Sequence, residues 1–249
     1  MSDIVLAAGG TWPLAWCVAV IFAAYALRGA TGFGAGVVAI PLLLLVLPLA
    51  VVIPVVTATG MLASLGQALH QYRHVDWISM RGLVLPTLAG VATGLWLFAA
   101  LDPNLLLKAF AVFIIGHALW DLVSTRPPRA SGGWLAVLAG AIGGLVATLF
   151  GGMAGPFYVV YLGSLALDKA RFRATLAVML LLLAAVRTAG YGGLGLYDAR
   201  VLVLLAVSVP VMALAMFAGD RWHRTMNEAK FRRVVGALLV LSGLALLFK

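Results

Sequence analysis

The chain has 249 residues, of which 64% are hydrophobic and 10% are charged, and its formal net charge is +9. A soluble domain has roughly a quarter of its residues charged and must cover its core with polar groups, so this composition excludes a water-soluble protein. The single cysteine, Cys17, excludes an intrachain disulfide and a cysteine-based metal cluster. Long apolar runs without strand-like alternation predict an all-α integral membrane protein.

Ten apolar segments follow one another along the chain. Several are shorter than the roughly 20 residues that a helix needs to cross a bilayer. The pairs of segments around Gly32 and Gly151 have almost no polar linker, so each pair is either two short helices or one discontinuous helix with a re-entrant limb. The segments are 12–27, 33–49, 51–69, 82–100, 104–122, 134–150, 153–167, 172–193, 199–218 and 232–248.

Basic residues gather in alternate links between these segments. They follow the first, third, fifth, seventh and ninth segments, whereas the other links are poor in Lys and Arg. Because the cytoplasmic loops of membrane proteins are rich in Lys and Arg, the pattern places the basic links in the cytoplasm and both termini outside. The stretches 167–173 and 220–233 are interpreted as basic interfacial loops of this kind.

A repeat relates the two halves at an offset of 119 residues, the separation of Gly32 and Gly151. At this offset GFGAG (32–36) aligns with GGMAG (151–155). Each half holds an odd number of segments, five, so the second half is predicted to insert upside down relative to the first, a common plan of secondary transporters. We therefore predict two inverted-topology five-segment repeats within one transmembrane domain, 1–249, with repeat one at 12–122, a cytoplasmic linker at 123–132 and repeat two at 134–248.

Two glycine-rich motifs, one near the start of each half, lie on either side of the basic central linker. They read GATGFGAGVVAIP (29–41) and GGMAGPFYVVYL (151–162), and TATGMLAS (57–64) and HVDW (74–77) accompany them. With these motifs the sequence resembles the TauE/SafE family of membrane transporters, also described as sulfite exporters. The resemblance covers essentially the whole chain and implies transport of sulfite, sulfonates or related small organic anions.

A small oxyanion in a low-dielectric interior needs donors in place of its hydration shell. Glycine-rich breaks free backbone N–H groups and expose helix N-termini, which carry a partial positive charge. Helices predicted to begin near Gly36 and Gly155 would direct such donors at one shared anion. The alternative is that Gly32 with Gly36, and Gly151 with Gly155, form GxxxG packing contacts between helices.

Arg187 lies within an apolar segment, where an ionisable residue is a functional hypothesis by default. The alternative is that it lies near the interface and extends its head group to water. Arg28 is either an anion ligand or a marker of the cytoplasmic end of the first segment. The candidate substrate-binding residues are Arg28, Thr31, Gly32, Gly34, Gly36, Thr57, Gln67, Thr148, Gly151, Gly152, Gly155 and Arg187.

His117 and Asp121 lie one helical turn apart in the fifth segment. Because histidine titrates near neutral pH, the pair is a candidate proton relay. The alternative is an interfacial hydrogen bond near the membrane edge.

These features predict a multi-pass secondary transporter of the bacterial inner membrane that exports a small anion by alternating access. An anion channel and a membrane assembly subunit without transport activity are the alternatives. The sequence contains neither a P-loop nor an H-E-x-x-H motif, so we expect neither ATP drive within this chain nor an enzyme, and no metal or cofactor. The expected partners are the small anion and the lipid bilayer, not nucleic acid, and a homo-oligomer stays open.

Overall fold

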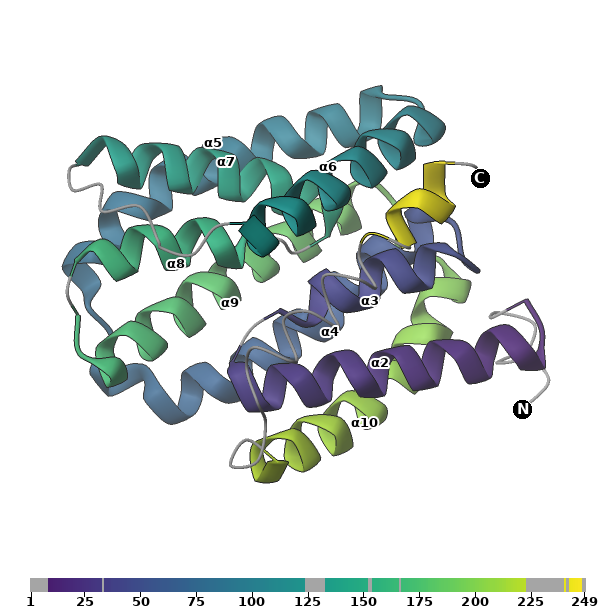
Figure 1. Ribbon diagram of the computed structural model, residues 1–249, viewed down its shortest axis with the longest axis horizontal. Helices are drawn as coiled ribbons and strands as arrows, with labels where there is room; N and C mark the ends of the chain where they lie inside the picture. Colours follow the sequence, from purple (N-terminus) through teal and green to yellow (C-terminus); the bar gives the residue numbers. More distant parts are fainter. Residues whose placement is uncertain are drawn as a thin grey trace. The chain divides into compact units, whose positions relative to one another are not determined.

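The computed structural model describes residues 9–32, 34–123, 133–151, 154–165, 167–222, 240 and 242–247. The regular elements within these ranges are helices (Figure 1), which confirms the predicted all-α architecture. In chain order they are α2 (Thr11–Thr31), α3 (Ala35–Leu44), α4 (Leu49–Gln71), η1 (Tyr72–His74), α5 (Trp77–Ala100), α6 (Pro103–Val123), α7 (Gly133–Phe150), α8 (Gly155–Ser164), α9 (Lys169–Gly193) and α10 (Ala199–Trp222).

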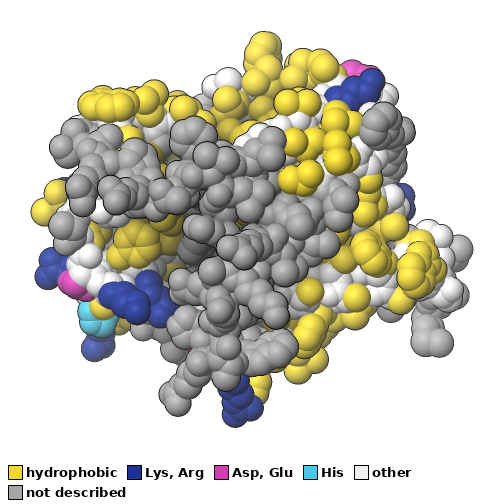
Figure 2. All heavy atoms as spheres, viewed as in Figure 1, with side chains coloured by type: hydrophobic (Ala, Val, Ile, Leu, Met, Phe, Trp, Pro, Cys, Tyr) yellow, Lys and Arg dark blue, Asp and Glu magenta, His cyan; other side chains and the backbone are white. Residues whose placement is uncertain are grey.

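Among the described residues, six helices are long and apolar enough to cross a membrane: α2, α4, α5, α7, α9 and α10. On the face shown in Figure 2, hydrophobic side chains cover much of the described surface, and charged side chains form small groups at its edges. An outer surface of this kind suits a protein surrounded by lipid. The predicted linker 123–132 and the tenth segment 232–248 lie largely outside the described residues.

In each half of the chain a long helix is followed by a short helix and then by two long helices. Helices α2 to α5 have 21, 10, 23 and 24 residues, and α7 to α10 have 18, 10, 25 and 24 residues. The 10-residue helices α3 and α8 are each about 15 Å long, about half of the hydrocarbon thickness. In each half the short helix follows a glycine with positive φ, Gly32 at 88° and Gly151 at 78°.

The helices form two compact units. Unit 1 consists of Met1–Val56, Leu101–Thr125 and Leu196–Lys249, and unit 2 consists of Thr57–Ala100 and Arg126–Gly195. Helix α4 begins in unit 1 and continues into unit 2. The units differ from the predicted repeats because α5, from the first half, belongs to unit 2 and α10, from the second half, belongs to unit 1.

In unit 1, α2 packs along α10 with direct backbone contact. A methyl group at Gly219 would overlap the carbonyl group of Ala26, so glycine permits this approach. The indole N–H of Trp16 donates to the carbonyl of Leu42 at 2.9 Å, which fastens α3 to α2.

In unit 2, α5 and α7 lie side by side (Figure 1) and again meet at glycines. A methyl group at Gly140 would lie 2.8 Å from Pro86 Cβ, and one at Gly144 would overlap the carbonyl oxygen of Thr87. The hydroxyl of Tyr158, on α8, forms a 3.1 Å hydrogen bond with the Thr87 hydroxyl. These contacts join α5, α7 and α8 through close backbone approach and one buried polar pair.

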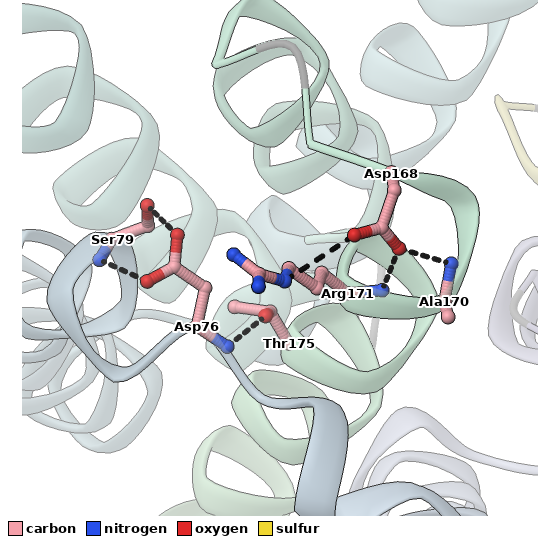
Figure 3. Close-up of polar contacts among 6 residues, drawn as sticks. All are labelled: Asp76, Ser79, Asp168, Ala170, Arg171 and Thr175. Atoms are coloured by element: carbon pink, nitrogen blue, oxygen red, sulfur yellow. Dashed lines mark hydrogen bonds and ion pairs between the residues drawn. The ribbon is translucent and has the colours of Figure 1, made fainter.

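The stretch 167–173, expected to be a loop, is helical from Lys169 onward. The Asp168 carboxylate accepts the backbone N–H groups of Ala170 at 3.0 Å and Arg171 at 2.9 Å (Figure 3), and so caps α9. The loop interpretation was wrong because it relied on apolar residues to identify helices. The charged first turn of α9 is stabilised by its cap and not by burial. Helix α10 likewise continues to Trp222.

Asp76 caps α5 in a similar way and also contacts α9 (Figure 3). Its carboxylate accepts the Ser79 hydroxyl at 2.7 Å and the Ile78 N–H at 3.2 Å, and its own N–H donates to the Thr175 hydroxyl at 2.9 Å. The Ser79 hydroxyl is the main reason that the pKa of the Asp76 carboxyl lies below its ordinary value, and Arg171 adds a smaller lowering. The ionised carboxylate therefore stabilises the fold.

We expect Asp76→Asn to make the free energy of unfolding depend less on pH in the acid range. A lowered pKa means that the contribution is fully present above the ordinary carboxyl pKa of about 3.9, and it is lost as the pH falls from there through the lowered value. At pH 7 the variant should lose about 0.5 kcal/mol, because asparagine keeps the cap but not the charge. Thermal denaturation in detergent from about pH 7 to 3 measures both effects, and equal acid slopes in the two proteins would contradict the prediction.

Candidate anion site in unit 2

Arg187 lies on α9 with its side chain 2% exposed. Its Nη2 donates to the hydroxyl of Thr57, on α4, at 2.7 Å and lies 3.5 Å from the hydroxyl of Tyr191, one helical turn further along α9. The guanidinium carbon lies 5.7 Å from the centre of the Tyr191 ring. Thr57 and Tyr191 are themselves buried. The guanidinium is thus buried among residues of unit 2.

No carboxylate neutralises Arg187 among the described residues. Within the described residues, the ion pair that is present joins Arg171 to Asp168 at 3.3 Å. The Nε atom of Arg187 is buried and has no hydrogen-bond partner there. Burying an unpaired charge costs several kcal/mol. The planar N–H fork of a guanidinium matches carboxylates and other oxyanions.

Tyr191 connects Arg187 to the end of α7. Its hydroxyl donates to the backbone carbonyl of Thr148, in the last turn before Gly151. The hydroxyl of Thr148 instead donates to the Gly144 carbonyl at 2.7 Å, within its own helix. Tyr191 therefore contacts the backbone of Thr148 and not its side chain.

The structure brings three of the predicted residues together: Arg187, Thr57 and Thr148. Gln67, Gly151 and Gly155 belong to the same unit. Five other candidates lie in unit 1, where Arg28 is buried; they are Arg28, Thr31, Gly32, Gly34 and Gly36. Gly152 lies outside the described residues, as do the side chains of Thr31, His117 and Asp121, the last two on α6.

Gly32 and Gly34 form the turn between α2 and α3. Their φ angles, 88° and 91°, strain any residue with a Cβ. Among the described residues no atom lies within 4 Å of a methyl group placed at either position. The positive φ angle of Gly32 by itself accounts for glycine at this position. Helix α3 begins at Ala35, next to the predicted start at Gly36.

Sequence reasoning missed Tyr191 and the buried pair of Tyr158 and Thr87. A signal for Tyr191 existed, because it lies one helical turn after Arg187 and such positions face the same way. No comparable signal exists for Tyr158 and Thr87, whose hydroxyls meet across 71 positions of the sequence.

Comparisons with known proteins agree with the predicted resemblance. A relative described as "Probable sulfite/organosulfonate exporter TauE", from Cupriavidus necator (strain ATCC 17699 / DSM 428 / KCTC 22496 / NCIMB 10442 / H16 / Stanier 337), is 26% identical over 241 residues, 94% of each chain. A second, "Probable inner membrane transporter protein TsaS" from Comamonas testosteroni, is 29% identical over 183 residues, 70% of this chain and 74% of that protein. No solved structure matches this chain significantly.

A family profile also matches most of the chain. Residues 17–246 match the profile described as "Sulfite exporter TauE/SafE". This range includes both glycine-rich motifs and the cluster around Arg187, and it confirms the resemblance predicted from the sequence. The chain therefore belongs to the TauE/SafE family of sulfite exporters.

Proposed function

We propose that the chain is a secondary transporter of the bacterial inner membrane that moves a small oxyanion, sulfite or an organosulfonate, outward by alternating access. The observation that carries this proposal is the buried Arg187 guanidinium, which has no carboxylate partner among the described residues. A buried positive charge without a permanent counter-ion can be neutralised by a transported anion that binds and is then released. The printed names of the two relatives, an exporter of sulfite or organosulfonates and an inner membrane transporter, support the same function.

The groups around Arg187 suit an oxyanion. The guanidinium offers Nε and its terminal nitrogens as adjacent donors, and Nε is unpaired. Thr57 accepts a bond from Nη2, so its own proton can be donated. A bound oxyanion would exchange part of its hydration shell for one guanidinium and one hydroxyl, in a low-dielectric interior where such bonds are strong.

The membrane potential supports export. An inside-negative potential of 100 mV favours the exit of a monoanion by about 2.3 kcal/mol. At equilibrium this difference holds the internal concentration about fiftyfold below the external one. An exporter of a monoanion therefore needs no additional energy source to keep the cytoplasm depleted of its substrate.

The matching helix lengths and the glycine break in each half support an inverted repeat, which is the basis of alternating access in many carriers. The breaks also leave the first amides of α3 and α8 available as anion donors. We propose that the breaks are the flexible points of the transport cycle. The remaining candidates keep the roles that the sequence predicts: Arg28, Thr31, Gly32, Gly34, Gly36, Gln67, Gly151, Gly152 and Gly155 as ligands, and His117 with Asp121 as a proton relay.

Counterflow in proteoliposomes tests this function. Vesicles containing the purified protein and loaded with unlabelled sulfite should accumulate external labelled sulfite transiently and with saturation, whereas protein-free vesicles should not. Uptake that never saturates and shows no counterflow would indicate a channel. No movement of sulfite, sulfonates, sulfate or carboxylates would exclude transport of these anions and favour an assembly subunit.

A further inference from the structure

The hydroxyl of Tyr191 lies between a hydrogen-bond donor and a hydrogen-bond acceptor. It donates its proton to the carbonyl of Thr148 and lies 3.5 Å from Nη2 of Arg187. A phenol has one proton to donate. While that proton is hydrogen-bonded to the carbonyl of Thr148, the hydroxyl can only accept a hydrogen bond from Arg187.

The carbonyl of Thr148 belongs to the last turn of α7, where carbonyl groups lack a partner further along the helix. The Thr148 hydroxyl bonds Gly144, so it does not compete for the phenol. The N–H of Gly151 donates to the Ala147 carbonyl at 2.7 Å and closes this turn directly at the break. The bond from Tyr191 thus fastens the end of α7 to α9.

The ring of Tyr191 is fixed in place. It is fully buried, and its centre lies 5.5 Å from that of the Phe98 ring. Beside it, a methyl group at Gly190 would lie 3.2 Å from Leu95 Cγ, so α9 lies tightly against α5 here. The hydroxyl therefore changes partner by rotating its O–H bond and not by moving the ring.

We propose that Tyr191 couples occupancy of the Arg187 site to the helix break at Gly151. An anion oxygen that takes over the Nη2 N–H now directed at the phenol, at about 2.8 Å, lies beside the phenol hydroxyl, and a charged acceptor binds a donor about twice as strongly as a neutral one. The O–H rotates from Thr148 to the anion, no covalent bond changes, and the last turn of α7 is released. Tyr191 is then a positioning residue, and this inference rests on the proposed function because it takes the anion as bound at Arg187.

Amide hydrogen exchange on the full-length protein in detergent tests the coupling. In the wild type, sulfite should speed exchange in the segment 147–155 about fivefold to tenfold, as expected for the loss of one hydrogen bond, and chloride should not. In Tyr191→Phe the segment should exchange at the faster rate with or without sulfite. Tyr158→Phe is the matched control, because it removes another buried phenol of unit 2 that contacts Thr87, and it should keep the response to sulfite.

Two results would overturn the coupling: a wild type that transports sulfite but shows no response in this segment, or a Tyr191→Phe variant that keeps the response. If Tyr191→Phe does not fold, the wild-type response decides the matter, since its absence alone contradicts the proposal. A wild type that transports no anion would overturn the proposed function instead, so the two failures are distinguishable.

Discussion

Replacing Arg187 with glutamine is expected to weaken the apparent affinity for the transported anion at least thirtyfold, while the protein still inserts into the membrane. Truncating one partner of a buried charged contact costs about 2 to 5 kcal/mol, and about 2 kcal/mol corresponds to thirtyfold. Glutamine retains a donor but carries no charge and lacks the fork that matches an oxyanion. The concentration dependence of sulfite uptake into proteoliposomes measures the change.

The same substitution should leave the empty protein at least as stable as the wild type. Arg187 is buried without a carboxylate partner among the described residues, so removing its charge removes a desolvation penalty. Residues kept for function often carry such a cost in stability. Thermal denaturation in detergent without added anion checks the sign. A clear drop in melting temperature would identify Arg187 as a structural residue and contradict its assignment to the anion site.

Two further variants separate charge from geometry. Arg171→Gln is the matched control, because Arg171 is exposed and paired with Asp168, and it should leave the apparent affinity unchanged. Arg187→Lys should fall between wild type and Arg187→Gln, because lysine keeps the charge but not the planar fork. An equal loss of affinity in Arg171→Gln would show that uptake responds to the net charge of the protein and not to the site.

The sequence predicted the helices well because each is an apolar run, and most of these runs are bounded by charge, glycine or proline. It misplaced the starts of α5 and α9, whose first turns are capped by Asp76 and Asp168. Hydropathy reports burial in lipid and does not register a side chain that satisfies backbone N–H groups. The grouping of α5 with α7 was not predictable either, because it depends on contacts between halves that the repeat alone leaves open.

The site was predictable in part. Arg187 could be identified because charge is rare inside an apolar segment, and this inference does not require knowing which residues it contacts. Its contact with Thr57 spans 130 positions of the sequence and has no local signal. The glycines show a related limit: the sequence could not distinguish Gly32, required by its φ angle, from Gly144, required by contact with a neighbouring helix. Both are glycines in apolar surroundings, and only the packing tells them apart.

Gly144→Ala is expected to destabilise the protein by about 3 kcal/mol, the upper end of the cost of overpacking. The added methyl group would overlap the carbonyl oxygen of Thr87 and lie 3.1 Å from the backbone nitrogen of Val91. Both are backbone atoms of α5, so no side chain can rotate away, and the two helices must separate. The melting temperature and the yield of monodisperse protein in detergent measure the loss.

Gly66→Ala is the matched control, because Gly66 lies on α4 in the same unit and no described atom lies within 4 Å of a methyl group there. Alanine is the better helix former, so this substitution should be neutral or stabilise the protein by about 0.5 to 1 kcal/mol. The two glycine-to-alanine changes therefore have opposite expected signs although their chemistry is the same. Equal destabilisation by both would show that contact between α5 and α7 does not set the cost.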